Sequence, residues 1–509
     1  MPKTKKQKGK TVYIREDIAN FIQLVKDNHK EDELISFLTQ NSEVILDSDN
    51  PIESVPVEET KLDKPVTLNQ DQLIAIEYLN DWFNSDKQTA TLSGAGGTGK
   101  TFAIGYWIQQ LGRIEKIIFL APTHKAKNVL MRSLETSNLD SPEVYTVAQA
   151  LGKQPIIMNT GLEEFQKEVE TNLINDSDLV VVDEASMVSV EDYYEILYKA
   201  QKVLFMGDKN QLPPVGESQS VAFADPPTCE LNKVMRYKGH ILDECQKLRQ
   251  AAQENYIHKI GADGKQIIRL KHNDALLRAT ELFKSREFED DSTFCRVVAY
   301  RNKKVESINK FIKPKVYGRD DDFFEGLRLI AAKPVQRKNK ITGKWDIYCN
   351  NSEELRIDSN IKISRIDERL LEDMPKNCKE LRSLIGVGKA TRFRCLSENG
   401  MRFTGLILDK EAMMKKLELM KLLQEMYKEK VTKNIKGALT FLYRWGDDLR
   451  DIFCSTVHKC QGSTFENVLI VEPDILRPSF NKQSWQSDDR PKLLYTAASR
   501  ASKKIYVMC

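Results

Sequence analysis

Short, nearly continuous hydrophobic runs mark the first half of the chain. They cover residues 116–120, 179–182 and 203–206, and an apolar-leaning run precedes them at 89–93. Strands that are hydrophobic on both faces belong to a parallel sheet covered on both sides, and polar residues at their carboxyl ends mark the edge where ligands bind. We therefore predict a buried parallel sheet, and the polar residues that follow each run become candidate functional residues.

A second set of runs predicts a second parallel sheet. It starts at residues 296–300 and resumes at 467–471 and 504–507. Residues 240–294 are predicted to be mainly helical, because hydrophobic residues recur there at helical spacing. The fold class expected from this pattern is α/β with two parallel sheets.

Two regions interrupt this pattern. Within residues 326–450, hydrophobic and polar positions alternate at 391–395 and 403–408, which indicates antiparallel strands. A helix is predicted from about Glu411, and a hydrophobic stripe along it is interpreted as core packing. Its members are Met413, Leu417, Met420, Leu423 and Tyr427. Residues 156–162 contain a glycine turn and predict a hairpin.

The N-terminal extension, residues 1–66, has a different composition. A lysine-rich tail covers residues 1–10, an acidic stretch with two predicted amphipathic helices follows, and residues 48–65 have the proline- and acid-rich composition of a linker. No chemistry is assigned to this extension, which is either a small docking module or an accessory segment.

Composition limits the classes of function. The net charge of +3 creates no global basic field, so any nucleic acid must bind in a local groove. The nine cysteines are scattered and the six histidines have no metal-ligand spacing, as expected for reduced thiols in a cytoplasmic protein. No run reaches transmembrane length and the first residues lack a signal-peptide core, so no membrane partner is expected.

The strongest motif lies between the run at 89–93 and a predicted helix. It has the phosphate-loop pattern G-x-x-x-x-G-K-[ST], in the strand–loop–helix setting that the pattern requires. Its residues are Gly94, Ala95, Gly96, Gly97, Thr98, Gly99, Lys100 and Thr101. Backbone N–H groups of such a loop surround phosphates, Lys100 can reach the β- and γ-phosphates, and the Thr101 hydroxyl can coordinate Mg²⁺. The sequence therefore predicts a nucleoside triphosphate and Mg²⁺ as ligands.

Two further sites support this interpretation. Asp183 and Glu184 directly follow the run at 179–182. An aspartate there can hold Mg²⁺, and the adjacent glutamate can orient and deprotonate the attacking water. Gln72, ahead of the loop, has the paired donor and acceptor that could read the adenine edge.

Taken together, the motifs resemble those of superfamily 1 helicases, specifically the RecD-like and Dda-like group 1B. The similarity covers about residues 67–509. It rests on Gln72 and on residues 94–101, 121–124, 183–184, 207–215, 234–236, 299–303, 455–462 and 494–501. The motifs at 207–215 and 494–501 are the most specific. One motif departs from the family pattern, because Thr146-Val147-Ala148 stands where relatives have Thr-Ile-His.

The resemblance implies roles for further residues. Gln211 corresponds to a sensor of the γ-phosphate, and Arg236 and Arg500 to arginine fingers that reach it. The expected contacts with nucleic acid are Pro122, Thr123, His124 and Thr146 on one half, and Asn302, Thr456 and His458 on the other. Such residues touch mainly phosphates and sugars, so binding should be largely independent of sequence.

The resemblance also implies a domain plan with two tandem RecA-like motor domains. Residues 1–66 form the extension. Residues 67–240 form the first motor domain, with a small pin insertion at about 152–176. Residues 241–325 contain its remainder and the start of the second motor domain, which ends with 451–509. Residues 326–450 form an SH3-like and helical insertion.

The activity implied is ATP-dependent 5′→3′ translocation on single-stranded DNA with unwinding of duplex DNA. The expected partners are single-stranded DNA and its junctions with duplex, with replication or single-strand-binding proteins as candidates, in a bacterial or phage-infected cell. Roles in replication, recombination or repair are expected by analogy. Two alternatives stay open: an RNA helicase of group 1B, and an ATP-switched nucleic-acid-binding or protein-displacing subunit that does not unwind.

Overall fold

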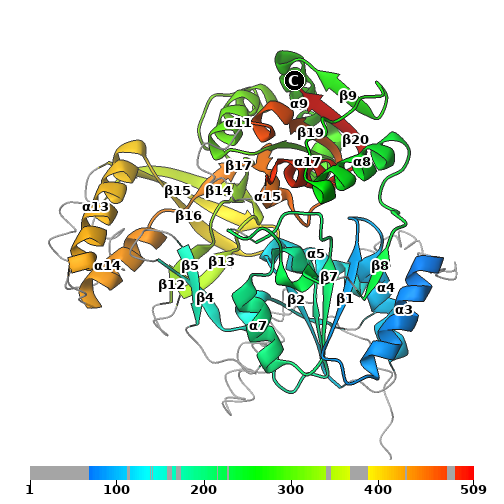
Figure 1. Cartoon of the computed structure of the whole chain (residues 1–509). Coiled ribbons are helices and arrows are strands. Elements are labelled where there is room, and N and C mark those ends of the chain that lie inside the picture. The colour runs from blue at the N-terminus through cyan, green and yellow to red at the C-terminus, as the bar shows by residue number, and fades with distance from the viewer. Residues whose placement is uncertain are drawn as a thin grey trace, which may run out of the picture. The chain divides into compact units, whose positions relative to one another are not determined.

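The computed structural model describes residues 68–509, apart from 112–114, 138, 140, 158–162, 168–172, 215, 226–227, 340–344, 367–387, 430–432 and 478–487. The N-terminal extension lies outside the described residues. The described part of the chain forms three larger sheets and two hairpins (Figure 1).

The first sheet has six parallel strands in the order β3-β2-β6-β7-β1-β8. They are β1 (Thr89–Gly94), β2 (Ile117–Ala121), β3 (Glu143–Thr146), β6 (Leu179–Val182), β7 (Val203–Gly207) and β8 (Cys229–Leu231). All four predicted runs are strands of this sheet. The crossovers between β1 and its sequence neighbours place the phosphate loop at a carboxyl edge, as expected for a nucleotide-binding α/β sheet.

Helices cover both faces of this sheet. The helices are α3 (Gln70–Phe83), α4 (Lys100–Gln110) and α5 (His124–Glu135) on one face, with α6 (Val147–Ala150) and α7 (Val190–Lys199) on the other. In β6, Leu179 and Val181 pack with the first group, while Val180 and Val182 pack with the second. Because successive side chains point to opposite faces, a strand covered on both sides is hydrophobic at every position.

The second sheet has five parallel strands in the order β18-β10-β19-β20-β9. They are β9 (Ile267–Leu270), β10 (Cys295–Ala299), β18 (Cys454–Thr456), β19 (Phe465–Val471) and β20 (Ala501–Met508). The helices of this part are α8 (His240–Glu254), α9 (His272–Phe283), α10 (Arg286–Asp290), α11 (Asn302–Tyr317), α15 (Val457–Cys460), α16 (Glu472–Ile475) and α17 (Arg490–Ala498). α8 and α17 pack on one face and α9 and α11 on the other.

An antiparallel insertion separates β10 from β18 in the sequence. Its sheet has the order β16-β15-β14-β11-β17, formed by β11 (Arg328–Ala331), β14 (Glu354–Arg365), β15 (Lys389–Ser397), β16 (Arg402–Leu408) and β17 (Leu449–Asp451). A hairpin of β12 (Val335–Lys338) and β13 (Trp345–Cys349) and the helices α13 (Lys410–Glu429) and α14 (Lys433–Arg444) complete it. α13 and α14 lie together at one end of β15 and β16 (Figure 1).

The predicted hairpin near residue 156 is present as β4 (Lys153–Ile157) and β5 (Glu163–Lys167), an antiparallel pair. Residues 240–294 are mainly helical, as predicted, and form α8, α9 and α10. They also contain an edge strand at residues 267–270, which the pattern did not indicate because four residues that pair on one side only leave a weak signal. One expectation was wrong. Leu417 is 51% exposed, so it does not belong to the core stripe of α13, whose buried members include Leu419 and Leu423. Tyr427 has no described side chain.

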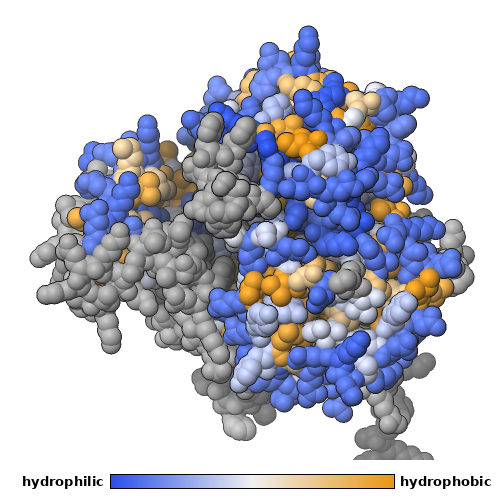
Figure 2. Space-filling model, viewed as in Figure 1, coloured by the Kyte–Doolittle hydropathy of each residue, from blue (hydrophilic) through white to orange (hydrophobic). Residues whose placement is uncertain are grey.

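The surface and the cysteines agree with the composition. Hydrophilic residues predominate on the face shown in Figure 2, between smaller hydrophobic patches. The eight cysteines in the described ranges are all unbridged. Within those same ranges, the helices are too short or too polar to cross a membrane.

Candidate nucleotide site and nucleic-acid contacts

The loop between β1 and α4 depends on two glycines in the left-handed region. Gly97 has a φ of +88°, and Gly99, the N-cap of α4, has a φ of +78°. Other residues avoid this conformation because their Cβ approaches the backbone. A Cβ on Gly97 would also lie 2.2 Å from the Cβ of Arg236. The hydroxyl of buried Thr98 closes the loop by donating to the Ala95 carbonyl at 3.0 Å.

Gln72 supports this loop from behind. Its side-chain carbonyl accepts from the Asn69 N–H at 3.0 Å, in the capping box that begins α3. Its amide group donates to the carbonyls of Thr98 and Gly99 at 3.3 and 3.4 Å. Both ends of the Gln72 amide thus bond to the protein, which links α3 to the loop. The predicted contact with adenine stays a prediction.

A cavity of about 360 Å³ lies next to the loop. Its lining residues come from helices and connections around both parallel sheets. All six predicted catalytic residues line it, namely Lys100, Asp183, Glu184, Gln211, Arg236 and Arg500, together with Gly96, Gly97, Gly99 and Thr101. Gln72, Gly94, Ala95 and Thr98 are not part of its lining. Residues more than 300 positions apart in the sequence therefore share one site.

Donor groups converge on one point in this cavity. A Cβ on Gly96 would lie 3.2 Å from Nη1 of Arg236, 3.3 Å from Nη2 of Arg500 and 3.6 Å from Nε2 of Gln211. Hydrogen-bond donors around a point at the start of a helix suit a ligand with anionic oxygens. In addition, Oε1 of Gln211 is buried and has no hydrogen-bond partner among the described residues.

The charged groups at the base of the cavity perturb one another. Nζ of Lys100 donates to the carbonyls of Gly94 and Ala95 at 2.7 and 3.2 Å. Burial lowers the pKa of Lys100, although nearby carboxylates oppose the shift. Burial, and then the neighbouring Glu184, raises the pKa of Asp183 to about 7. A phosphate or a cation at this site would compensate these buried charges.

The donor set fits a divalent cation held jointly with phosphate. Thr101 and Asp183 line the same cavity and offer the oxygen ligands that Mg²⁺ prefers. Among the described residues there is no cluster of three histidine, cysteine or acidic side chains that could hold a metal without a substrate.

The two arginines are held by neighbouring backbone. Arg500 is 1% exposed, and it donates to the carbonyls of Thr496 and Ser463 at 3.0 and 3.2 Å and to the Ser499 hydroxyl at 2.9 Å. Nη1 of Arg236 donates to the Ser499 carbonyl at 3.5 Å. Burial, and then Arg500, lowers the pKa of Arg236 to about 10, so it stays charged at neutral pH.

Glu184 has a backbone conformation that is unusual for a residue other than glycine. Its φ is +49°, in the left-handed region, at the start of a short 3₁₀ turn. A non-glycine residue held there costs about 1–3 kcal/mol, which the surrounding structure must supply. The conformation directs Glu184 into the cavity that Lys100 and Arg236 also line.

Three of the predicted nucleic-acid contacts are threonines with one common geometry. Thr123, Thr146 and Thr456 are N-caps of α5, α6 and α15, and each hydroxyl oxygen accepts a backbone N–H at 3.1–3.3 Å. Accepting this bond leaves the hydroxyl proton as a donor for a phosphate oxygen. Thr123 follows β2, and Thr146 and Thr456 are the last residues of β3 and β18, so the three occupy carboxyl edges of the two sheets.

Of the remaining predicted contacts, Pro122, His124 and His458 lie within two residues of these threonines in the chain, and Asn302 does not. Pro122 precedes Thr123, and His124 begins α5. Burial, and then Lys127, lowers the pKa of His124 to about 4, so its ring is neutral at physiological pH. His458 lies in α15 with its ring centroid 6.2 Å from that of Tyr300. Asn302 begins α11 and accepts from Nη1 of Arg450 at 3.0 Å.

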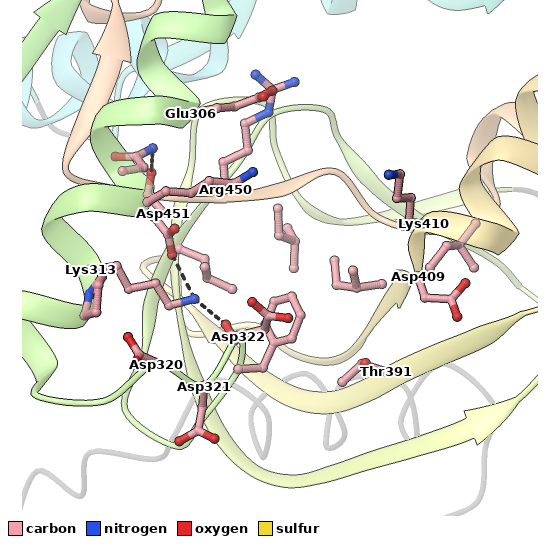
Figure 3. Close-up of a pocket in the computed structure, with 18 of the residues that line it drawn as sticks. Glu306, Lys313, Asp320, Asp321, Asp322, Thr391, Asp409, Lys410, Arg450 and Asp451 are labelled. Carbon is pink, nitrogen blue, oxygen red and sulfur yellow. Dashed lines mark hydrogen bonds and ion pairs between the residues drawn. The ribbon is translucent and has the colours of Figure 1, made fainter.

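A larger cavity, of about 810 Å³, lies between α11 and the insertion (Figure 3). Its lining mixes carboxylates and cations, and Lys313 pairs with Asp451 at 3.6 Å and donates to the Asp322 carbonyl. Burial raises the pKa of Asp451. The lining contains none of the glycine-rich loop, so the smaller cavity is the better nucleotide site.

Sequence reasoning missed residues that join the two motor halves. Asp208, directly after β7, bonds to Tyr495 of α17 and lies beside Arg249 of α8. Asp208 and Tyr495 fall inside recognised motifs, which could have drawn attention to them. Arg249 lies in a helix outside every motif, so no pattern in the sequence distinguishes it.

Comparison with known proteins defines the class. An AAA domain matches residues 67–273, and a UvrD-like helicase C-terminal domain matches residues 451–508. The first match covers the whole first sheet and extends through α8 and β9, and the second covers β18, β19 and β20 of the second sheet. The chain is therefore similar to a P-loop ATPase domain in its first part and to a helicase domain in its last part.

The chain is also similar to individual proteins. The chain is 28% identical over 306 residues to the ATP-dependent DNA helicase Dda of phage T4, covering 57% of this chain and 67% of the phage protein. It is 26% identical to the uncharacterized protein R530 of Acanthamoeba polyphaga mimivirus, over 82% of this chain and 94% of that protein. The crystal structure of a Bacteroides Pif1 helicase with ADP-AlF3 and ssDNA aligns with a TM-score of 0.45 at 14% identity, covering 87% and 93% of the two chains.

Proposed function

We propose that this protein is an ATP-dependent DNA helicase that moves 5′→3′ along single-stranded DNA and unwinds duplex ahead of it. The observation that carries the proposal is the convergence above Gly96. There, donors of Gln211 and Arg236 meet Arg500, which the chain supplies from the second motor half. A nucleotide bound in such a cavity contacts both halves, so its hydrolysis can change their relative position.

Each residue has a proposed role in hydrolysis. The loop and Lys100 bind the phosphates, and Glu184 orients and deprotonates the attacking water. Arg236 and Arg500 stabilise charge on the transferred phosphoryl group, which for an arginine finger is worth about 10³–10⁵ in rate. Nε2 of Gln211 donates to the γ-phosphate, while its unpaired Oε1 can accept from the water. Thr101 and Asp183 would hold Mg²⁺, which would neutralise phosphate charge.

The strand is proposed to lie across the carboxyl edges of the two sheets. Thr123, His124 and Thr146 would hold it on the first half, and Asn302, Thr456 and His458 on the second. Alternating grip by the two halves would advance the strand with each ATP. Because these groups address phosphates and sugars, affinity should fall with salt and depend little on base sequence.

We propose three further properties from the similarity to group 1B. They are the 5′→3′ direction, the preference for DNA, and a role in replication, recombination or repair in a bacterial or phage-infected cytoplasm. Partial duplexes of matched DNA and RNA, each with a 5′ or a 3′ tail, test direction and substrate together. We expect unwinding of the 5′-tailed DNA substrate. Unwinding of the RNA substrates instead would establish the RNA-helicase alternative. DNA-stimulated ATPase without strand separation would establish the switch alternative.

Two variants make this experiment specific. Lys100→Ala should abolish DNA-stimulated ATPase and unwinding, because it removes the ammonium group at the phosphate site. Lys421→Ala is the matched control, since Lys421 is exposed on α13 away from the cavity. Full DNA-stimulated activity in Lys100→Ala would show that the assigned site is wrong.

The hairpin of β4 and β5 is a proposed separation pin. Its antiparallel strands pair from Lys153 with Lys167 to Ile157 with Glu163. Deletion of residues 157–163 should keep DNA-stimulated ATPase and reduce unwinding. Equal unwinding by the deletion variant and the full chain would make it a hairpin without this role.

A further inference from the structure

Asp208 connects the two motor halves at a position next to the nucleotide cavity. It follows β7, is fully buried, and its Oδ1 accepts the N–H of Asn210 at 3.1 Å. Its backbone carbonyl accepts the N–H of Gln211 at 3.0 Å. These bonds fix the turn that carries Gln211, so the position of Asp208 sets the position of that side chain.

The other carboxylate oxygen bonds across to the second half. The phenol of Tyr495 donates to Oδ2 of Asp208 at 2.5 Å, and Tyr495 is also fully buried. Burial, and then Asp208, raises the pKa of Tyr495, so the phenol keeps its proton. A buried carboxylate loses its hydration and needs such donors to stay charged.

Hydrogen bonds from the end of α17 lead on to both arginines. The carbonyl of Tyr495 accepts the N–H of Ser499 at 2.9 Å. The Ser499 hydroxyl accepts from Arg500, and its carbonyl accepts from Arg236. A short path of hydrogen bonds therefore runs from Gln211 through Asp208 and Tyr495 to the two guanidinium groups.

Two further contacts hold this path in place. Nε of Arg249 lies 3.6 Å from Oδ1 of Asp208, and its Nη2 pairs with Glu230 of β8 at 2.9 Å. Leu212, next to Gln211, is 2% exposed and packs in the hydrophobic core of the second half with Tyr495. The turn that carries Gln211 is thus attached to the second half by polar and apolar contacts.

We propose that Tyr495 and Asp208 are positioning residues that align Gln211 with Arg236 and Arg500, so that sensor and arginines act on the nucleotide together. This inference rests on the proposed ATPase function and adds two residues that do not themselves touch the nucleotide. The pair acts on the alignment of groups around the γ-phosphate, while the loop that binds the nucleotide is unaffected. The alignment should therefore change kcat more than KM.

Tyr495→Phe is the test, because it removes one oxygen and keeps the buried ring. Single-stranded-DNA-stimulated ATPase should lose about tenfold or more in kcat, the effect expected for losing a hydrogen bond to a charged group. KM for ATP should stay within about threefold of the parent value, since the phosphate loop is untouched.

Tyr506→Phe is the matched control. Tyr506 is also buried in the second half, and its hydroxyl accepts from Arg278 at 3.2 Å, away from the cavity. The control should keep the parent kcat while losing similar thermal stability. An unchanged kcat in Tyr495→Phe, or an equal loss in both variants, would overturn the inference.

Should Tyr495→Phe not fold, Arg249→Met addresses the same carboxylate from a side chain that is 20% exposed. It should also lower kcat more than KM, and an unchanged kcat would overturn the inference. The parent chain separates this question from the proposed function: absence of DNA-stimulated ATPase in the parent would contradict the proposed function itself.

Discussion

Substitution of Gly97 by alanine should disable the site through a contact that can be measured in the structure. The new Cβ would lie 2.2 Å from the Cβ of Arg236, whereas ordinary contact begins at about 3.4 Å. The segment carrying Arg236 must therefore retreat by more than 1 Å. It would also strain the bonds by which the N–H groups of Met235 and Arg236 reach the Gly97 carbonyl at 2.7 and 3.2 Å.

The expected loss is large. A misplacement of about 1 Å in a catalytic group can cost about 10²-fold in rate, or about 2.7 kcal/mol in the activation free energy. The left-handed φ of Gly97 adds about 1–2 kcal/mol of strain to the folded state. Steady-state ATPase with saturating single-stranded DNA measures the first effect, and urea unfolding measures the second.

Gly400→Ala is the control that separates backbone strain at a left-handed glycine from displacement of Arg236. Gly400 has a φ of +77° in the turn between β15 and β16, and a Cβ there would meet nothing within 4 Å. This control should lose similar stability and keep its ATPase. If Gly97→Ala kept its kcat within about threefold of the parent chain, the contact between Arg236 and the loop would have no catalytic consequence.

Three further predictions address the support of the site. Gln72→Ala should raise KM for ATP about tenfold in steady-state assays, because the loop loses hydrogen bonds from a buried amide, whereas Asn69→Ala should alter only the cap of α3. The free energy of unfolding should fall as the pH drops from about 6.5 toward 4, because the unfolded chain protonates His124 before the folded chain does. Urea titrations at several pH values should show a smaller fall for His124→Gln. Trp107→Ala should lower the free energy of unfolding by about 3–5 kcal/mol, because Trp107 is fully buried. A smaller loss would show that the hydrophobic core beside the first sheet relaxes into the space that the indole leaves.

Much of the fold followed from hydrophobic runs because both faces of each parallel sheet are covered. The run at 179–182 predicts its strand unambiguously, since all four side chains are buried. The strand at 267–270 gave no such signal, because only Ile267 of its four residues is buried. The prediction that Leu417 belongs to the core failed for a related reason. Helical spacing shows which residues share a face of the helix, but the neighbours that cover that face come from elsewhere in the chain.

The residues of the candidate site also differ in how far the sequence alone predicts them. Local chemistry indicated Lys100 and Asp183, because a loop or a strand end presents them whatever the rest of the chain does. The approach of Arg500 to Gly96 depends on how two halves pack, and only family resemblance anticipated it. The bond between Asp208 and Tyr495 has neither source, since it joins buried side chains 287 positions apart.

The insertion begins and ends on neighbouring strands. β11 and β17 pair with each other, so that Leu329 lies opposite Asp451 and Ala331 opposite Leu449. The chain of more than a hundred residues between them thus leaves and re-enters the second motor half at two adjacent points. Accessory modules could be exchanged or resized there during evolution while the ATPase stays intact, and the same junction is a natural place to build chimeric motors.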